Sequence, residues 1–231
     1  MDADTQLLFH WIPIVLGLLM FTPFGDKIAP VFAKMWPSAI SHRGKLMTGT
    51  LLVLLGGFTV SVHTLWIHNK ALEFGSGSFC ASGGVWDCSS VIGNDEWNVD
   101  PFFGLPWGIL GMLSFTVLMW LVLSVARDPN SLWARNHLRI ARFIGFSGIF
   151  IILYLVYAEF SIGKLCQYCT TAHLAHVFGL VGSVLLLKAY DEKNWSDEND
   201  GDEDDGKPDR RGKKQGYVAP VHVGKASTEE E

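Results

Sequence analysis

Charged residues are scarce in this sequence: they make up 18% of its 231 positions, against 49% hydrophobic and 13% aromatic residues. The few charges gather near the ends and in short patches, which leaves long apolar stretches between them. The sequence also lacks an internal repeat and a nucleotide-phosphate loop, which argues against a repeat architecture and against nucleotide-driven chemistry. This composition is typical of an all-α integral membrane protein.

Five apolar runs come close to the roughly 20 residues that a helix needs to cross a bilayer about 30 Å thick. They are Leu7–Phe24, Leu46–Ile67, Leu105–Ala126, Ile140–Phe160 and Cys169–Leu187. The first run is short and contains Pro13, and a cleaved signal peptide is the alternative reading. Because the N-terminus has Asp2 and Asp4 and no positive segment, we expect a retained helix.

Lysine and arginine in short connections mark the cytoplasmic side of a membrane protein. Most follow the first and third runs, at positions Lys27, Lys34, Arg43, Lys45, Arg127, Arg135 and Arg139. The alternate segments, 68–104 and 161–165, contain only Lys70 and Lys164. We therefore expect the N-terminus and both of these segments outside the cytoplasm, in a multi-pass protein of a bacterial cell membrane.

The composition changes abruptly after Leu187. Residues 188–231 are rich in Asp and Glu and then carry a basic patch, which is typical of a solvated, disordered cytoplasmic tail. The tail supplies most of the formal net charge of -5, so this charge gives no reason to expect a nucleic-acid partner. The expected organisation is an N-terminal helix with its cytoplasmic connection over 1–43, a helical domain over 44–187, and the tail.

All four cysteines fall on the outer side, where paired thiols serve either structure or redox chemistry. Cys166 and Cys169 form a Cys-x-x-Cys motif at the start of the last apolar run. The free N–H groups and the dipole of a helix N-terminus stabilise anions, so this position favours the thiolate that attacks disulfides and electrophilic carbons. Haem attachment would need a histidine next, where the chain has Thr170.

Zinc binding is the metal alternative, because His173 and His176 would share a helix face with both cysteines. The axial distance from Cys166 to His176 is about 15 Å at 1.5 Å per residue, whereas zinc ligands lie about 2 Å from the ion. We therefore expect no metal. His173 is either a residue lining a functional pocket or a histidine hydrogen-bonded to a neighbouring helix.

Cys80 and Cys88 lie in a segment rich in glycine and serine, which predicts a mobile backbone. The pair is either a structural staple, worth roughly 2 to 3 kcal/mol of loop-closure entropy, or a shuttle that swings between a second dithiol and another partner.

Together these features resemble the vitamin K epoxide reductase family over about residues 44–187. The shared pattern is a helix, an outer segment with two cysteines eight residues apart, three further helices, and Cys-x-x-Cys opening the last. Other matching segments are Cys88-Ser89-Ser90-Val91, Phe103-Gly104-Leu105-Pro106, Tyr154-Leu155-Val156-Tyr157 and Gly163-Lys164-Leu165-Cys166. The resemblance implies a four-helix bundle around a quinone, with the outer segment 68–104 as a lid and Leu7–Phe24 as an extra N-terminal transmembrane helix.

The resemblance also implies roles for the cysteines. Cys169 would attack a quinone of the menaquinone, ubiquinone or phylloquinone type, with Cys166 as its exchange partner. Cys88 would trade disulfides with Cys166, and Cys80 would meet an external thiol protein. Some relatives carry a fused thioredoxin-like domain; here we expect a separate thioredoxin-like partner.

Candidate residues of the quinone pocket rest on the same resemblance. His173 stands where animal members carry a tyrosine that hydrogen-bonds a quinone oxygen. Trp97 would either cap the quinone ring or anchor the chain at the membrane interface, and Asn94 stands where the family often has a serine. Glu159 would be either a proton relay or an interfacial residue, and we expect the interfacial position.

The expected function is oxidation of partner thiols and reduction of quinone, in support of disulfide formation outside the cytoplasm. One alternative is reduction of vitamin K or its epoxide by the same relay. The non-enzymatic alternative is a membrane scaffold with two static disulfides.

Overall fold

The computed structural model describes residues 3–74, 84–94 and 96–192, and these residues belong to one compact unit. About 80% of them are helical, which confirms the predicted all-α class. The elements are α1 (Ala3–Met20), α2 (Gly25–Ala33), the 3-10 helix η1 (Pro37–Ile40), α3 (His42–Phe74), α4 (Cys88–Ile92), α5 (Trp107–Arg127), α6 (Ala134–Ile162) and α7 (Gln167–Asp191).

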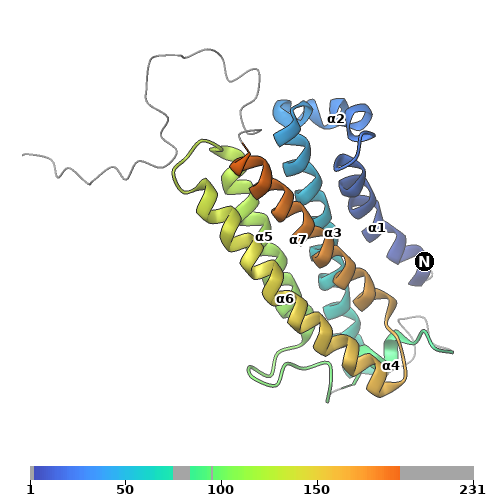
Figure 1. Ribbon diagram of the computed structural model, residues 1–231. Coiled ribbons are helices and arrows are strands. Elements are labelled where there is room, and N and C mark those ends of the chain that lie inside the picture. The colour runs from blue at the N-terminus through green and yellow to red at the C-terminus, as the bar shows by residue number, and fades with distance from the viewer. Residues whose placement is uncertain (1–2, 75–83, 95, 193–231) are drawn as a thin grey trace, which may run out of the picture. The chain divides into compact units, whose positions relative to one another are not determined.

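Four long helices, α3, α5, α6 and α7, form a bundle (Figure 1). Each is long and apolar enough to cross a membrane. α3 packs against α5, α7 and α1, while α6 packs against α5 and α7. The outer face of α6 exposes large apolar side chains, among them Phe143 and Phe150, as expected of a helix that faces lipid. The chain is thus a multi-pass membrane protein built on a four-helix bundle.

The first apolar run departs from the prediction of one helix over Leu7–Phe24. α1 ends at Met20, and the chain bends by 114° between Thr5–Met20 and α2. Pro23 accounts for the break, because proline lacks an N–H and disfavours the helical conformation of the residue before it. Taken together, the bent pair of α1 and α2 is apolar enough for a fifth, broken span or for a re-entrant segment.

α1 packs closely on α3. A Cβ atom added to Gly17 would lie 2.5 Å from the carbonyl oxygen of Gly49, so the missing side chain lets the two backbones approach. A polar contact lies further along the same helix pair, where His10 Nε2 is 2.9 Å from His63 Nδ1. The extra N-terminal helix is therefore an integral part of the packed unit.

α3 continues to Phe74, beyond the predicted start of the outer segment at residue 68. Lys70 forms an ion pair with Glu73 and lies 4.9 Å from the centre of the Phe74 ring, and both contacts stabilise the added helical turns. His68 is buried on the other face of these turns and accepts a hydrogen bond from the Asn98 amide at 2.9 Å. The end of α3 thereby supports the segment that follows α4.

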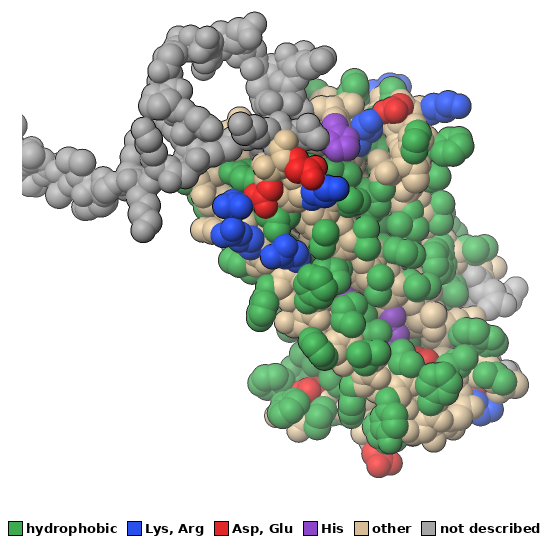
Figure 2. Space-filling view, viewed as in Figure 1, with side chains coloured by type: hydrophobic (Ala, Val, Ile, Leu, Met, Phe, Trp, Pro, Cys, Tyr) green, Lys and Arg blue, Asp and Glu red, His purple; other side chains and the backbone are tan. Residues whose placement is uncertain are grey.

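The two ends of the bundle differ in their content of Lys and Arg. Lys and Arg side chains gather at the end where α2 and the α5–α6 connection lie, and apolar side chains cover the middle (Figure 2). Near the opposite end, which carries α4, the described chain has Lys70 and Lys164. This distribution fits the predicted orientation, in which the α2 end faces the cytoplasm.

Candidate functional site

The Cys-x-x-Cys motif lies where α7 begins. Cys166 is the N-cap residue of α7, and its sulfur accepts a hydrogen bond from the backbone N–H of Cys169 at 3.1 Å. Both cysteines carry free thiols; Cys166 is fully buried and Cys169 is half-buried. The predicted position at a helix N-terminus is confirmed, and the Cys169 N–H together with the helix dipole stabilises negative charge on the Cys166 sulfur.

Cys88 is the first residue of α4. Asp87 caps this helix, because its carboxylate accepts hydrogen bonds from the Ser90 backbone N–H at 3.1 Å and from the Ser89 and Ser90 hydroxyls at 2.7 and 2.9 Å. The hydrogen bond from the Ser89 hydroxyl, and to a smaller extent those from Ser90, hold the pKa of Asp87 below its ordinary value. Cys88 is disulfide-bonded and 1% exposed. Cys80 lies outside the described residues.

Backbone hydrogen bonds join the Cys88 segment to the Cys166 segment. The Asp87 N–H donates to the Leu165 carbonyl at 3.0 Å, and the Leu165 N–H donates to the Val85 carbonyl at 2.9 Å. Asp87 and Leu165 each precede a cysteine in the chain, so the contact aligns the two cysteines. As a result, Cys88 and Cys166 belong to one buried apolar cluster.

Further contacts extend this join. The Lys164 ammonium donates to the Gly84 carbonyl at 2.8 Å. Tyr168, one of the two residues between the motif's cysteines, is fully buried in the cluster that also contains Cys88 and Ile67 of α3. The two cysteine segments thus meet in a dry, closely packed environment at the α4 end of the bundle.

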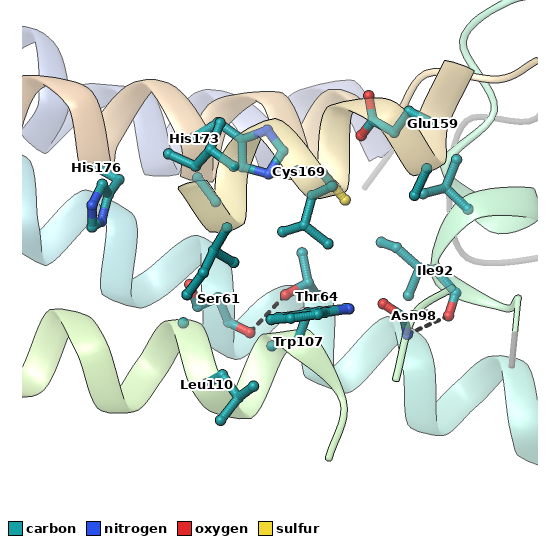
Figure 3. A pocket seen from close by; sticks show the side chains of 18 of the residues that line it. Ser61, Thr64, Ile92, Asn98, Trp107, Leu110, Glu159, Cys169, His173 and His176 are labelled. Carbon is teal, nitrogen blue, oxygen red and sulfur yellow. Dashed lines mark hydrogen bonds between the residues drawn. The ribbon is translucent and has the colours of Figure 1, made fainter. Parts of the chain in front are cut away.

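A cavity of about 140 Å³ opens beside Cys169 between the four long helices (Figure 3). Its walls are mostly apolar, and an engineered cavity of about 150 Å³ in another protein accommodates a benzene ring. The space therefore suits a planar ring. The polar and aromatic residues that line it are Ser61, Thr64, Trp97, Asn98, Trp107, Ser114, Phe115, Glu159, Cys169, His173 and His176.

The two histidines that line the cavity differ in their bonding. His176 is buried, and its Nε2 donates to the Gly145 carbonyl at 2.9 Å. Neither ring nitrogen of His173 has a hydrogen-bond partner among the residues that the structure describes. His173 lies one helical turn beyond Cys169. Its ring N–H therefore remains available to a molecule in the cavity. Of the two alternatives for His173, this agrees with a residue that lines a functional pocket.

Trp97 and Asn94, both predicted to lie in the quinone pocket, take different positions in the segment before α5. Trp97 lines the cavity, and its ring centre lies 6.0 Å from that of Tyr154 and 6.1 Å from that of Tyr157. Asn94 does not appear among the described lining residues. Its side-chain oxygen accepts hydrogen bonds from the backbone N–H groups of Glu96 at 3.0 Å and Trp97 at 3.2 Å. Asn94 therefore shapes the turn that carries Trp97 into the cavity wall.

Asn98 lines the cavity but was not predicted. Its amide donates to the Ile92 carbonyl at 2.6 Å and to His68 Nδ1 at 2.9 Å. Because a side-chain amide has two N–H bonds, both donors are occupied, and Asn98 holds its segment against α3 and α4. No local pattern indicated this residue, since it and His68 are 30 positions apart.

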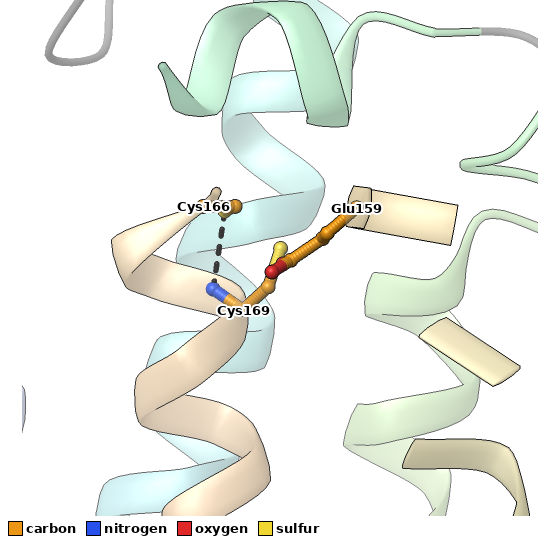
Figure 4. Close-up of side chains that lie close together, drawn as sticks. All are labelled: Glu159, Cys166 and Cys169. Carbon is orange, nitrogen blue, oxygen red and sulfur yellow. Dashed lines mark hydrogen bonds between the residues drawn. The ribbon is translucent and has the colours of Figure 1, made fainter. Parts of the chain in front are cut away.

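The position of the Glu159 side chain differs from the expected one. We expected it at the membrane interface, but it is 4% exposed and lines the cavity. A carboxylate oxygen of Glu159 and the sulfurs of Cys166 and Cys169 all lie within 4.8 Å of one another (Figure 4). The expectation failed because helix length placed residue 159 near the end of α6 without showing that its side chain points toward α7. Among the described residues, this trio, and not the set with His173 and His176, has the spacing of metal ligands.

A helical membrane bundle with a free dithiol at a helix N-terminus, a disulfide-bonded cysteine beside it and an apolar cavity against one thiol has the features of a membrane thiol oxidoreductase. The sequence model of the vitamin K epoxide reductase family matches residues 49–184, which is more than half of the chain. The chain belongs to this family, and it is accordingly an oxidoreductase of the membrane thiol–disulfide and quinone class. No curated protein matches the chain.

Proposed function

We propose that this oxidoreductase carries electrons from a separate thioredoxin-like protein to a quinone, and thereby supports disulfide formation outside the cytoplasm. Electrons pass from the partner to Cys80 and Cys88, then to Cys166 and Cys169, and then to the quinone. The observation that carries the proposal is the hydrogen-bonded join between residues 85–87 and Leu165. It holds the Cys88 segment against the segment of a second dithiol, which a purely structural disulfide would not require.

The exchange between the two pairs runs through Cys88 and Cys166. After the partner reduces a Cys80–Cys88 disulfide, the Cys88 thiolate attacks Cys166 in an oxidised Cys166–Cys169 pair and releases Cys169 as a thiolate. The α7 N-terminus stabilises the charge that develops on the motif's sulfurs. Cys80 then attacks Cys88, which restores the outer disulfide and leaves Cys166 reduced.

The cavity beside Cys169 receives the quinone ring. Cys169 lines this cavity, and His173 offers a ring N–H that no described protein group uses. A hydrogen bond from His173 to a quinone oxygen stabilises the negative charge that develops when the thiolate adds to the ring. Trp97 covers the ring from the loop side, held by its contacts with Tyr154 and Tyr157.

The proposed organisation places residues 1–43 in the N-terminal helix and its cytoplasmic connection and the residues from 44 onward in the catalytic bundle. The sequence placed the start of the cytoplasmic tail at residue 188, but α7 continues to Asp191 with Ala189 buried, so the proposed tail begins after α7. All four cysteines then face the non-cytoplasmic compartment. A membrane-impermeant thiol reagent is expected to label Cys80 in intact cells after mild reduction. Labelling of Cys80 only after membrane rupture would overturn this orientation.

Purified protein in detergent or lipid, supplied with a reduced thioredoxin-like protein and a quinone, tests the function directly. We expect the quinone absorbance to fall at a rate that depends on the partner thiols, and Cys169→Ala to abolish this fall. Parallel assays with vitamin K epoxide determine whether the same relay also reduces the epoxide. Absence of turnover with benzoquinone and naphthoquinone acceptors alike would contradict the proposed function.

A further inference from the structure

Glu159 occupies an unusual place for a carboxyl group. It lies one turn before the end of α6, where its backbone carbonyl accepts the Lys164 N–H at 3.2 Å. Gly163 follows in the left-handed conformation, with φ of 71°, and reverses the chain. This reversal brings the start of α7 back across Glu159, so that the carboxyl group comes within 4.8 Å of both motif sulfurs (Figure 4).

The fold satisfies this carboxyl group only in part, because the backbone N–H of Cys166 hydrogen-bonds to it but one of its two oxygens is left over. The side chain is 4% exposed, and its Oε1 atom has no hydrogen-bond partner among the described residues. No Lys or Arg belongs to the described lining of the cavity that Glu159 shares with Cys169. Burying a carboxyl group without a paired cation costs stability. In a membrane protein such a residue marks a functional site by default.

We propose that Glu159 is a catalytic residue that accepts the proton of the Cys166 thiol and delivers it to the quinone. This inference rests on the proposed function, because it assigns the proton transfer within the same reaction. A carboxylate oxygen of Glu159 lies close to Cys166 Sγ, and the group also faces the cavity in which the quinone would sit. It therefore reaches both the source of the proton and its destination.

The Cys169 thiolate adds to a ring carbon of the quinone, forming an S–C bond and moving an electron pair toward a quinone oxygen. Cys166 then gives its proton to Glu159, and its sulfur attacks Cys169 Sγ. The S–S bond forms, the S–C bond breaks and its electron pair remains on the ring. In total the two sulfurs lose two electrons and the one proton still on Cys166, which reaches a hydroquinone oxygen by way of Glu159. The other hydroquinone oxygen takes its proton from water, to which Cys169 released its own proton when the thiolate formed.

Glu159→Gln separates this role from a structural one. Glutamine keeps the size of the side chain and a hydrogen-bond acceptor but cannot take up a proton at neutral pH. The measurement is a single turnover: the variant is reduced beforehand, freed of reductant and mixed with quinone, while absorbance follows hydroquinone formation. Since acid–base groups typically contribute about 100-fold or more, we expect the first-order rate to fall at least about tenfold. The quinone Kd and the thermal midpoint are expected to stay unchanged.

The matched control is Glu73→Gln, which removes an exposed carboxylate at the same end of the bundle and is expected to leave the rate unchanged. A wild-type rate in Glu159→Gln would overturn the inference, as would a slower rate explained by weaker quinone binding or a lower thermal midpoint.

A second arm uses Glu159→Ala with added formate. The inference predicts that formate restores the rate in proportion to its concentration, and the absence of rescue would contradict it. If wild-type protein itself fails to reduce quinone, the proposed function fails as well. An active wild type with an equally active Glu159→Gln removes only the role of Glu159.

Discussion

The backbone N–H of Asp87 donates to the carbonyl of Leu165 at 3.0 Å, which joins the residue before Cys88 to the residue before Cys166. Thiol–disulfide exchange requires close approach of the sulfurs, and groups held near one another react much faster than free ones. This join is therefore the structural basis on which Cys88 exchanges with Cys166.

Asp87→Ala is expected to weaken this arrangement. The Asp87 carboxylate caps α4 and holds the hydroxyls of Ser89 and Ser90. Loss of an N-cap typically costs about 1 kcal/mol, so we expect a lower thermal midpoint and a slower exchange between the two cysteine pairs. Thermal unfolding and stopped-flow exchange with reduced partner measure these effects. Asp128→Ala, at an exposed position at the end of α5, is the control and is expected to change neither.

The same contact predicts a pH dependence. Because hydrogen bonds depress the pKa of Asp87 below 3.8 in the folded chain, its contribution to stability is complete above the unfolded pKa of about 4. The contribution is lost as pH falls through the folded pKa. The stability difference between wild type and Asp87→Ala should thus be constant from about pH 8 to pH 5 and shrink below about pH 4. A difference that shrinks already between pH 7 and pH 5 would contradict this assignment.

His173→Ala is expected to lower quinone reduction at saturating partner thiol by at least about tenfold, a conservative value for a donor that acts on the transition state. His173→Tyr is expected to retain much of the activity, because a phenol also donates a hydrogen bond from this position. Steady-state assays on folded protein measure both variants. Full activity in His173→Ala would remove this residue from the site.

By contrast, His176→Ala breaks the hydrogen bond to the Gly145 carbonyl, so its expected effect is a lower thermal midpoint.

Much of this arrangement could be predicted from sequence, because apolar run length reports membrane helices and local spacing reports the Cys-x-x-Cys motif at the α7 N-terminus. Residues that act through distant contacts could not. The burial of Glu159 depends on the chain reversal at Gly163, and the role of Asn98 depends on His68 in α3. The break after Met20 escaped prediction because hydrophobicity outweighed the local signal of Pro23.

Gly17→Leu is expected to loosen α1 from α3. A Cβ atom at Gly17 would lie 2.5 Å from the Gly49 carbonyl oxygen, and a backbone atom cannot easily move away. Overpacking of this kind typically costs about 1 to 3 kcal/mol. The thermal midpoint in detergent should therefore fall. Val15→Leu enlarges an exposed side chain of the same helix and serves as the control. Equal midpoints for the two variants would show that α1 does not pack as described.

The relay itself is tested most directly by a double variant that combines Cys80→Ala with Cys169→Ala. This variant lacks both thiols that can resolve a Cys88–Cys166 mixed disulfide, so a disulfide formed between these two cysteines under mild oxidation persists. Mass spectrometry of peptides from the non-reduced variant is therefore predicted to show a Cys88–Cys166 disulfide as the major species. A variant in which Cys88 and Cys166 both remain free thiols after the same oxidation would contradict the proposed route of electrons.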